Sequence, residues 1–379
     1  MTLDTPSRAK SRTSEEAAAI PGQSRHFMGE AGNPLLAPRG VHLADGKLIV
    51  ADTGQNRVFI WNQLPGSTYA DADVVLGQTE TESTGRNAGG QAGASTLLYP
   101  SGLWSDGEKL VVCDAWNHRV LIWNSFPSDH GQPADLVLGQ PDFNNHEPNV
   151  GGVSSPPTAQ SLNWPYGVDS DGERLFIADT GNRRVLVFDQ WPTENYAAAS
   201  SVIGKPNFTE RDYDHHQPIW PYSVKMGPAG QLAIADTQYY RVMLYPDWTK
   251  AVAPVADREP ILIGQSSLAD NGQNQFGWFP KAHTLNWCYD ACFWKDGLLV
   301  ADTGNSRVLH FRQLPTQNNQ SADALLGQAN FELGIENRNS IEASDNSLYW
   351  PFHLAVETDT LAIADTGNHR IVIHQLSQD

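Results

Sequence analysis

The chain is poor in cysteine, in basic residues and in long apolar runs. It has 3 cysteines in 379 residues, and this odd number fits a reducing compartment better than a disulfide scaffold. No run approaches the roughly 20 apolar residues that span a bilayer, and residues 1–23 lack the apolar segment of a secretory signal. The 25 Lys and Arg are outnumbered by 43 Asp and Glu, so the net charge of −18 disfavours nucleic acid. These absences predict a cytoplasmic protein with no nucleic-acid and no membrane partner.

What the chain does contain is a repeated segment. Six copies align without gaps: LIVADTGQNRVFIW (48–61), LVVCDAWNHRVLIW (110–123), LFIADTGNRRVLVF (175–188), LAIADTQYYRVMLY (232–245), LLVADTGNSRVLHF (298–311) and LAIADTGNHRIVIH (361–374). Their aspartates are Asp52, Asp114, Asp179, Asp236, Asp302 and Asp365, spaced by 62, 65, 57, 66 and 63 residues. Self-similarity at a period of about sixty residues indicates a solenoid, a propeller or an array.

Within each unit, hydrophobic residues alternate with a period of two, and Asp-Gly or Thr-Gly turn signals bound the runs. In the third unit this pattern predicts strands at 164–170, 174–179, 183–189 and 200–204. Four antiparallel strands per unit are typical of a propeller blade. The sequence therefore predicts an all-β, six-bladed β-propeller.

A second marker predicts how the ring closes. The triplets LGQ (76–78, 138–140, 326–328), IGK (203–205) and IGQ (263–265) end the fourth strand of five blades, and MGE (28–30) supplies the sixth copy. Residues 26–30 are therefore expected to form the outermost strand of the last blade, which removes an open sheet edge. This places one domain at 23–379, preceded by a flexible segment at 1–22.

The ADTGNxRV copies, together with PxGV…DG, resemble NHL repeats over roughly residues 26–375. The resemblance implies a six-bladed NHL-type β-propeller with unusually long blades. It leaves the function open, because NHL propellers serve as protein- or RNA-binding modules, as sensor domains and, in the peptidyl-hydroxyglycine amidating lyases, as metal enzymes.

The extra length falls in the connections from the fourth strand of one blade to the first strand of the next. Five of these connections are long, and in a four-stranded blade they emerge on the same face as the turns between the second and third strands. Long ordered loops on one face of a rigid scaffold are where binding usually resides. The alternative is that they only brace neighbouring blades.

Two recurrent features are interpreted as structural. Each repeat aspartate is followed five residues later by an arginine, and a sixfold pair is expected to cap and orient the tight turn rather than to catalyse. The aromatic residues before the first strand of blades two to six are expected to pack between blades; they are Tyr99, Trp164, Trp220, Trp287 and Trp350.

Function is expected where the blades differ. Two places after the proline of the first strand, Gly40, Gly102 and Gly167 face Ser223, Asp290 and His353. The last three are the catalytic candidates, expected in one pocket at the channel mouth, with the carboxylate favouring a charged imidazole and binding that depends on pH near neutrality. The ligand-binding candidates stand one place after the same proline or its substitute; they are Tyr166, Tyr222, Tyr289 and Arg39.

Cys288 replaces that proline in the fifth blade, and Cys292 follows on the same face of the strand. With His353 and His283 they are candidate ligands of zinc or copper. The two cysteines lie about 13 Å apart on an extended strand, so a site of Cys288 or Asp290 with His353 is geometrically easier. The alternative is that the cysteines are buried as small hydrophobes.

The sequence therefore predicts a propeller that binds a small molecule or peptide at the loop-bearing mouth of its channel. One alternative is a metal-dependent lyase or hydrolase that uses the same mouth. Another is a scaffold for a protein partner, which would use the blade rims.

Overall fold

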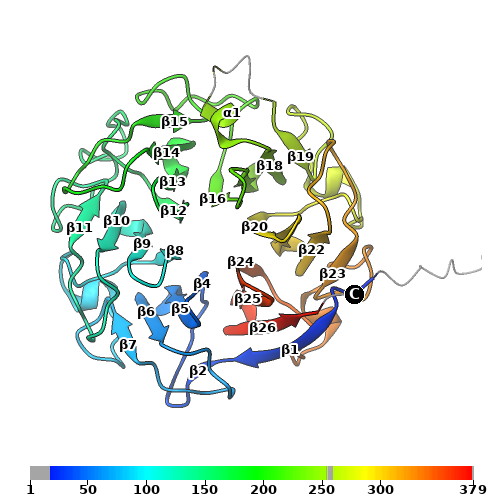
Figure 1. The fold of residues 1–379 in the computed structure, drawn as a ribbon, viewed down its shortest axis with the longest axis horizontal. Coiled ribbons are helices and arrows are strands. Elements are labelled where there is room, and N and C mark those ends of the chain that lie inside the picture. Colours follow the sequence, from blue (N-terminus) through cyan, green and yellow to red (C-terminus); the bar gives the residue numbers. More distant parts are fainter. Residues whose placement is uncertain (1–17, 253, 255–258, 378–379) are drawn as a thin grey trace, which may run out of the picture.

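The computed structural model describes residues 18–252, 254 and 259–377, and these residues form six four-stranded antiparallel sheets arranged in a ring (Figure 1). The predicted six-bladed β-propeller is confirmed. Within the described residues, no helix has both the length and the apolar character needed to cross a membrane.

Each blade is a sheet whose strands follow one another from the channel outward. The first three blades are β4 (Gly40–Ala44), β5 (Lys47–Asp52), β6 (Arg57–Trp61) and β7 (Val74–Leu76); β8 (Pro100–Ser105), β9 (Leu110–Asp114), β10 (Arg119–Trp123) and β11 (Leu136–Leu138); and β12 (Pro165–Ser170), β13 (Leu175–Asp179), β14 (Arg184–Phe188) and β15 (Ser201–Ile203). The next two are β16 (Pro221–Met226), β17 (Leu232–Asp236), β18 (Arg241–Tyr245) and β19 (Ile261–Ile263); and β20 (Cys288–Trp294), β21 (Gly297–Asp302), β22 (Arg307–Phe311) and β23 (Ala324–Leu326).

The sixth blade joins the two ends of the chain. It contains β24 (Pro351–Glu357), β25 (Thr360–Asp365), β26 (Arg370–Leu376) and, outermost, β1 (Gly22–Phe27). Closure by an N-terminal strand is confirmed, but the predicted position, 26–30, is wrong. Phe27 lies opposite Ile371, the place that Leu326 holds opposite Val308 in the fifth blade.

The physical reason for this shift is burial. Phe27 is fully buried, whereas Met28, which the triplet alignment placed there, is only half-buried. Gly29 and Glu30 instead form β2 (Gly29–Glu30), which pairs with β3 (Asn33–Pro34).

The short outermost strands are covered by the neighbouring blade. The connection between the third and fourth strands of one blade runs along the outer strand of the preceding blade, as where Asn319 N–H donates to Leu262 O. In the fourth blade this connection contains the one α-helix of the described residues, α1 (Trp248–Val252), which packs against β15.

For β23 the N-terminal segment takes that role. Ile20 N–H donates to Leu325 O, Leu325 N–H donates to Ala18 O, and Ile20 is buried in the core between the last two blades. The predicted flexible segment, 1–22, lies mostly outside the described residues. Residues 18–21 are described, and they belong to the fold. Each such cover blocks an edge that could pair with another chain.

The core is divided into six hydrophobic clusters, one between each pair of adjacent blades. Inside the ring the first strands approach so closely that a Cβ on Gly167 would lie 2.6 Å from Tyr222 O. Glycine at this position therefore permits the contact between neighbouring strands on one side of the channel.

The repeated Asp and Arg form six buried ion pairs, as expected for a structural motif. In each, Arg Nε donates to Asp Oδ2 at 2.7–2.9 Å. In blade three, Asp179 Oδ1 accepts the Asn163 N–H, and Arg184 Nη2 donates to the carbonyls of Thr158 and Ser161. The pair therefore ties the tight turn to the long loop beside it.

The repeated threonine links one blade to the next. Thr180 Oγ1 donates to Pro221 O at 2.6 Å, and Thr53, Thr237, Thr303 and Thr366 make the equivalent bond in their blades. These bonds fix the starting residue of each following inner strand.

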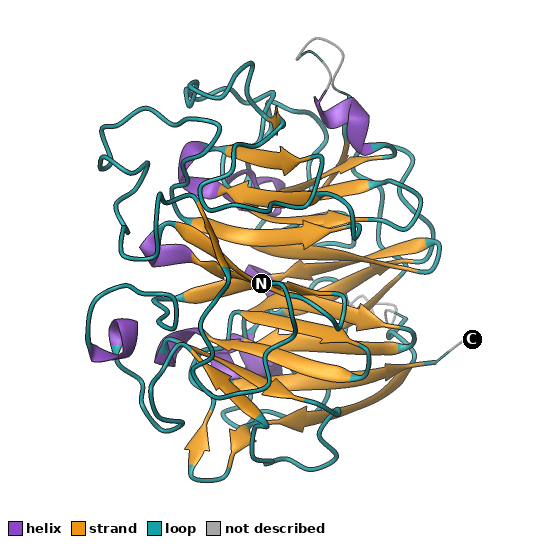
Figure 2. Cartoon of the chain, turned by 60° about the vertical axis from the view of Figure 1, so that its left-hand side comes forward, coloured by secondary structure: helices purple, strands orange, loops and turns teal. Residues whose placement is uncertain are grey.

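The five long connections leave the ring on one face, together with the 3₁₀ turns of the repeats (Figure 2). They are braced rather than loose. Gln140 Nε2 donates to His118 O and Glu147 O, and Asn149 and Asn182 exchange side-chain hydrogen bonds. The loop-bearing face is therefore built on an ordered frame.

Candidate functional site

The inner strands start at the loop-bearing face, and there most of them break register. A shift in pairing lies between Pro165 and Gly167, and the equivalent shift occurs in β8, β16, β20 and β24. The residue just after the proline lies within this shift, which a β-bulge uses to re-aim a side chain. Around the ring these residues are Arg39, Ser101, Tyr166, Tyr222, Tyr289 and Phe352.

The aromatic members of this ring contact one another across the channel mouth. Tyr166 stacks on Tyr222 with centroids 4.7 Å apart, Tyr222 meets Tyr289 edge-on at 4.5 Å, and Tyr289 lies 4.1 Å from Phe352. Three of the four ligand-binding candidates are thus brought together. Tyr222 is buried by its neighbours, whereas Tyr289 and Tyr166 keep partial access to solvent.

The three catalytic candidates lie one residue further along their strands. Ser223, Asp290 and His353 are all at most 2% exposed, and none of them lines the pocket at the mouth. The expectation that they line that pocket is wrong, because the circle of mostly aromatic residues one position earlier in each strand lies nearer the mouth. Their catalytic role stays a prediction.

Asp290 and His353 are neighbours, but the imidazole is not held in a charged state. Asp290 Oδ2 accepts the Leu354 N–H at 2.8 Å and lies 3.6 Å from His353 Nδ1, which donates to Val41 O at 3.0 Å. Burial lowers the pKa of His353 to about 4, although Asp290 acts in the opposite direction. The expected pH dependence near neutrality is therefore not supported by this environment.

Further from the mouth the channel holds a small cavity of about 140 Å³, lined by His42, Asp169, Lys225 and Cys292 among others. Burial lowers the pKa of Lys225, but the nearby carboxylates of Asp290 and Asp169 outweigh burial and raise it. Burial raises the pKa of Asp169 to about 6. This end of the channel is a compact network of opposite charges.

The aromatic residues before the inner strands contact neighbouring blades, as where Trp164 meets His118 and Trp220, but they are not buried in the core. Trp164, Trp287 and Trp350 are 38%, 41% and 45% exposed. These three and Tyr99 have φ between 48° and 59°, a left-handed conformation that is strained for a bulky residue, above all before proline. The backbone N–H of Trp164 donates to His118 Nδ1, which helps to hold this turn.

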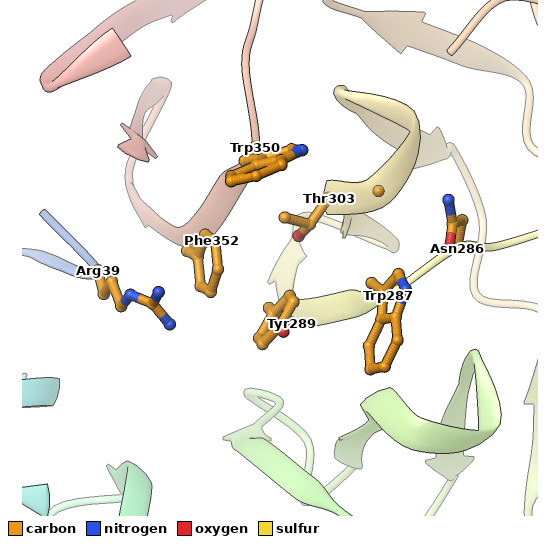
Figure 3. Close-up of a pocket in the computed structure, with 8 residues that line it drawn as sticks. Arg39, Asn286, Trp287, Tyr289, Thr303, Trp350 and Phe352 are labelled. Carbon is orange, nitrogen blue, oxygen red and sulfur yellow. The ribbon is translucent and has the colours of Figure 1, made fainter. Parts of the chain in front are cut away.

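Trp287 and Trp350 help to line a pocket of about 370 Å³ above the fifth and sixth blades (Figure 3). Its walls are Arg39, Asn286, Trp287, Tyr289, Thr303, Gly304, Trp350 and Phe352. The volume falls in the range of small-molecule sites, and four of the eight lining residues are aromatic, beside the polar side chains of Arg39, Asn286 and Thr303. Two of the predicted ligand-binding residues, Arg39 and Tyr289, thus share this pocket.

The candidate metal ligands are not brought together. Cys288 lies in the core between the fourth and fifth blades and its thiol donates to Arg241 O at 3.2 Å, whereas Cys292 lies in the core between the fifth and sixth blades. Burial raises the pKa of both thiols, which opposes the thiolate that a metal requires. His283 is half-buried in the loop before β20, and burial lowers its pKa.

One other group has suitable donor atoms. Within the described residues, Asp214, His215 and His216 alone meet the geometry of three metal-ligating side chains, in the loop before β16. Asp214 Oδ1 already accepts hydrogen bonds from the backbone N–H and the imidazole of His216.

Trp287 and Trp350 line the pocket but were not among the predicted ligand-binding residues, although both were recognised as recurrent aromatics. The signal was present in the tryptophan that precedes four of the six inner strands. What the sequence did not show is the left-handed backbone, which turns these side chains toward the mouth instead of into the core.

No family model and no curated protein sequence matches this chain. Among solved structures, an auxiliary nutrient binding protein from Bacteroides thetaiotaomicron matches with a TM-score of 0.53 and 10% identity, covering 93% of this chain and 75% of that one. A catalytically inactive virginiamycin B lyase from Staphylococcus aureus with quinupristin matches at a TM-score of 0.47 and 12% identity, covering 94% of this chain and 100% of the other. These similarities concern the propeller fold alone.

Proposed function

We propose that this propeller binds a small molecule or peptide in the pocket at the loop-bearing mouth of its channel. The observation that carries the proposal is the set of strained, half-exposed tryptophans, Trp287 and Trp350, facing Arg39 across an aromatic pocket. Strain of this kind persists only where the surrounding structure imposes it, and it concentrates at binding sites. We also propose that the chain is an NHL-type propeller and that it is located in the cytoplasm.

The proposal is tested by screening small molecules and short peptides against the purified protein, using thermal shift and tryptophan fluorescence. A compound that binds the mouth should lose most of its affinity in Trp287→Ala and in Trp350→Ala. Trp278→Ala is the matched control, because Trp278 is on the loop that leads to Trp287 but does not line the pocket. Unchanged affinity in both pocket variants would place the binding elsewhere, and equal loss in all three variants would show that the effect is not specific to the pocket.

A protein partner is the second candidate, and one observation favours it. Phe276, Trp278 and Phe279 are 82%, 96% and 69% exposed in the loop before β20. Exposed aromatics of this kind are enriched at protein interfaces. Sedimentation should then show concentration-dependent self-association that is lost when all three are replaced by serine. A wild-type protein that stays monomeric at high concentration removes self-association as their role.

A further inference from the structure

Arg39 differs from the residues at the five equivalent positions of the ring. They are Ser101, Tyr166, Tyr222, Tyr289 and Phe352, none of which carries a charge at neutral pH. Among the eight described residues that line the mouth pocket, Arg39 alone carries a permanent charge.

Arg39 also differs from the arginines of the repeat. Each of those six is ion-paired with an aspartate inside its own blade. Arg39 forms no ion pair with any carboxylate of the described residues, in a chain where acidic residues outnumber basic ones. A half-buried guanidinium without an acidic partner has lost part of its hydration and gained no opposite charge in return.

The surroundings of Arg39 are aromatic. The guanidinium carbon lies 4.2 Å from the ring centre of Phe352 and 5.2 Å from that of Tyr99. The phenol of Tyr222 is a further neighbour. Cation–π contacts of this kind attract the guanidinium to the rings, and its planar set of N–H donors suits a carboxylate or a phosphate.

We propose that the mouth pocket binds an organic anion, with Arg39 holding the carboxylate or phosphate group and Trp287, Trp350 and Tyr289 contacting its apolar or planar body. This inference rests on the proposed function, since it names the ligand class of the same pocket. The charged group and the aromatic walls lie in one cavity of about 370 Å³, so one small ligand reaches both (Figure 3).

The proposal is tested with three probes that share one aromatic body: 2-naphthoate, 2-naphthyl phosphate and the uncharged 2-naphthamide. Binding is measured by calorimetry and by quenching of tryptophan fluorescence. At least one of the two anions should bind the wild-type protein about tenfold or more tightly than the amide, because a charge-assisted bidentate contact exceeds a neutral one. The tighter of the two anions identifies the carboxylate or the phosphate as the preferred group.

Two substitutions of Arg39 and one control complete the test. Arg39→Gln should remove the advantage of the anions over 2-naphthamide, and the melting temperature of the variant shows whether the protein still folds. Arg39→Lys should retain only part of the advantage, because an ammonium lacks the planar pair of donors. Arg86→Gln is the control, since Arg86 is an exposed arginine of the same face outside the pocket.

The outcomes separate this inference from the proposed function. If the amide binds the wild-type protein as tightly as both anions and Trp287→Ala weakens all three, the pocket binds ligands but the anion assignment is overturned. If the anions keep their advantage in Arg39→Gln, another group recognises the charge and the role of Arg39 is overturned. If no probe binds, the inference fails, and the compound screen decides the proposed function separately.

Discussion

His353 Nδ1 lies 3.6 Å from Asp290 Oδ2, yet its hydrogen bond goes to the carbonyl of Val41 at 3.0 Å. Because a carbonyl only accepts, Nδ1 carries a proton, and the neutral ring then has its lone pair on Nε2. A carboxylate next to a histidine does not make the histidine cationic when both are removed from water, since desolvation opposes the charge.

The pKa of His353, about 4 instead of 6.5, predicts how stability changes with pH. Below pH 6.5 the unfolded chain takes up a proton at this residue before the folded chain does, so acidification favours unfolding until about pH 4. The His353→Gln variant has no imidazole at this position to take up that proton. The free energy of unfolding of the wild type should therefore fall relative to that of the variant by about 3 kcal/mol between pH 7.5 and pH 4.

Urea unfolding at several pH values measures this difference, and the ring protons of His353 in NMR report its titration directly. An imidazole that titrates between pH 6 and 8 in the folded protein would contradict the prediction.

The left-handed backbone of Trp287 predicts an unusual order of stability among its variants. With φ at 48°, alanine retains the strain of a Cβ, whereas glycine adopts this conformation freely. Trp287→Gly should therefore be more stable than Trp287→Ala by about 1 kcal/mol, although both lose the indole from the pocket. Thermal unfolding of the two variants checks this order, and an alanine variant that is the more stable would show that the backbone relaxes.

Residues 18–21 are predicted to contribute to stability. A truncation that begins at Ala18 is compared with one that begins at Gly22, so the difference isolates the segment that covers β23. Because Ile20 is 2% exposed in the core, the shorter protein should lose about 2–5 kcal/mol, and Ile20→Ala in the longer one should reproduce most of the loss. Equal melting temperatures of the two truncations would contradict a structural role for this segment.

The buried thiols predict slow chemistry and bear on the metal hypothesis. Cys113, Cys288 and Cys292 are all buried, and burial raises the pKa of each thiol. Ellman's reagent should therefore react with the native protein at least about a hundredfold more slowly than with the unfolded chain. Metal analysis of protein purified without added metal is the companion measurement. If the protein contains stoichiometric zinc or copper, and removal of the metal makes the thiols reactive, the metal-dependent enzyme is favoured instead.

The parts of the fold that repeat were predictable from the sequence, because six copies average out the ambiguity of any single strand. Asp179 and Arg184 could be assigned a structural role for the same reason, and their buried ion pair confirms it. The closing strand occurs once, so only the match of MGE to LGQ fixed its register, and the better burial of Phe27 shifted the pairing by one residue.

The candidate site was predicted only in part, because its side chains are positioned by backbone irregularities. The register shift around Tyr289 and the left-handed turn at Trp287 reverse which residues face the mouth. Comparison of equivalent positions in the six blades placed Asp290 at the mouth, whereas the pocket wall contains the preceding residue, Tyr289. Arg39 was named as a candidate, but its place in the pocket wall and its lack of an acidic partner become visible only in three dimensions.

The closure of the sixth blade has a consequence for how the protein is made. Ser24 Oγ bonds to His374 Nδ1 across 350 residues of sequence, so β1 leaves the ribosome long before β26, the strand with which it pairs. At about 5–20 residues per second, this delay is roughly 20–70 s of translation. During that time β1 has no native partner within its own chain. Two nascent chains on one messenger could then exchange their first strands, so slower translation of the C-terminal blade should increase strand-swapped dimers.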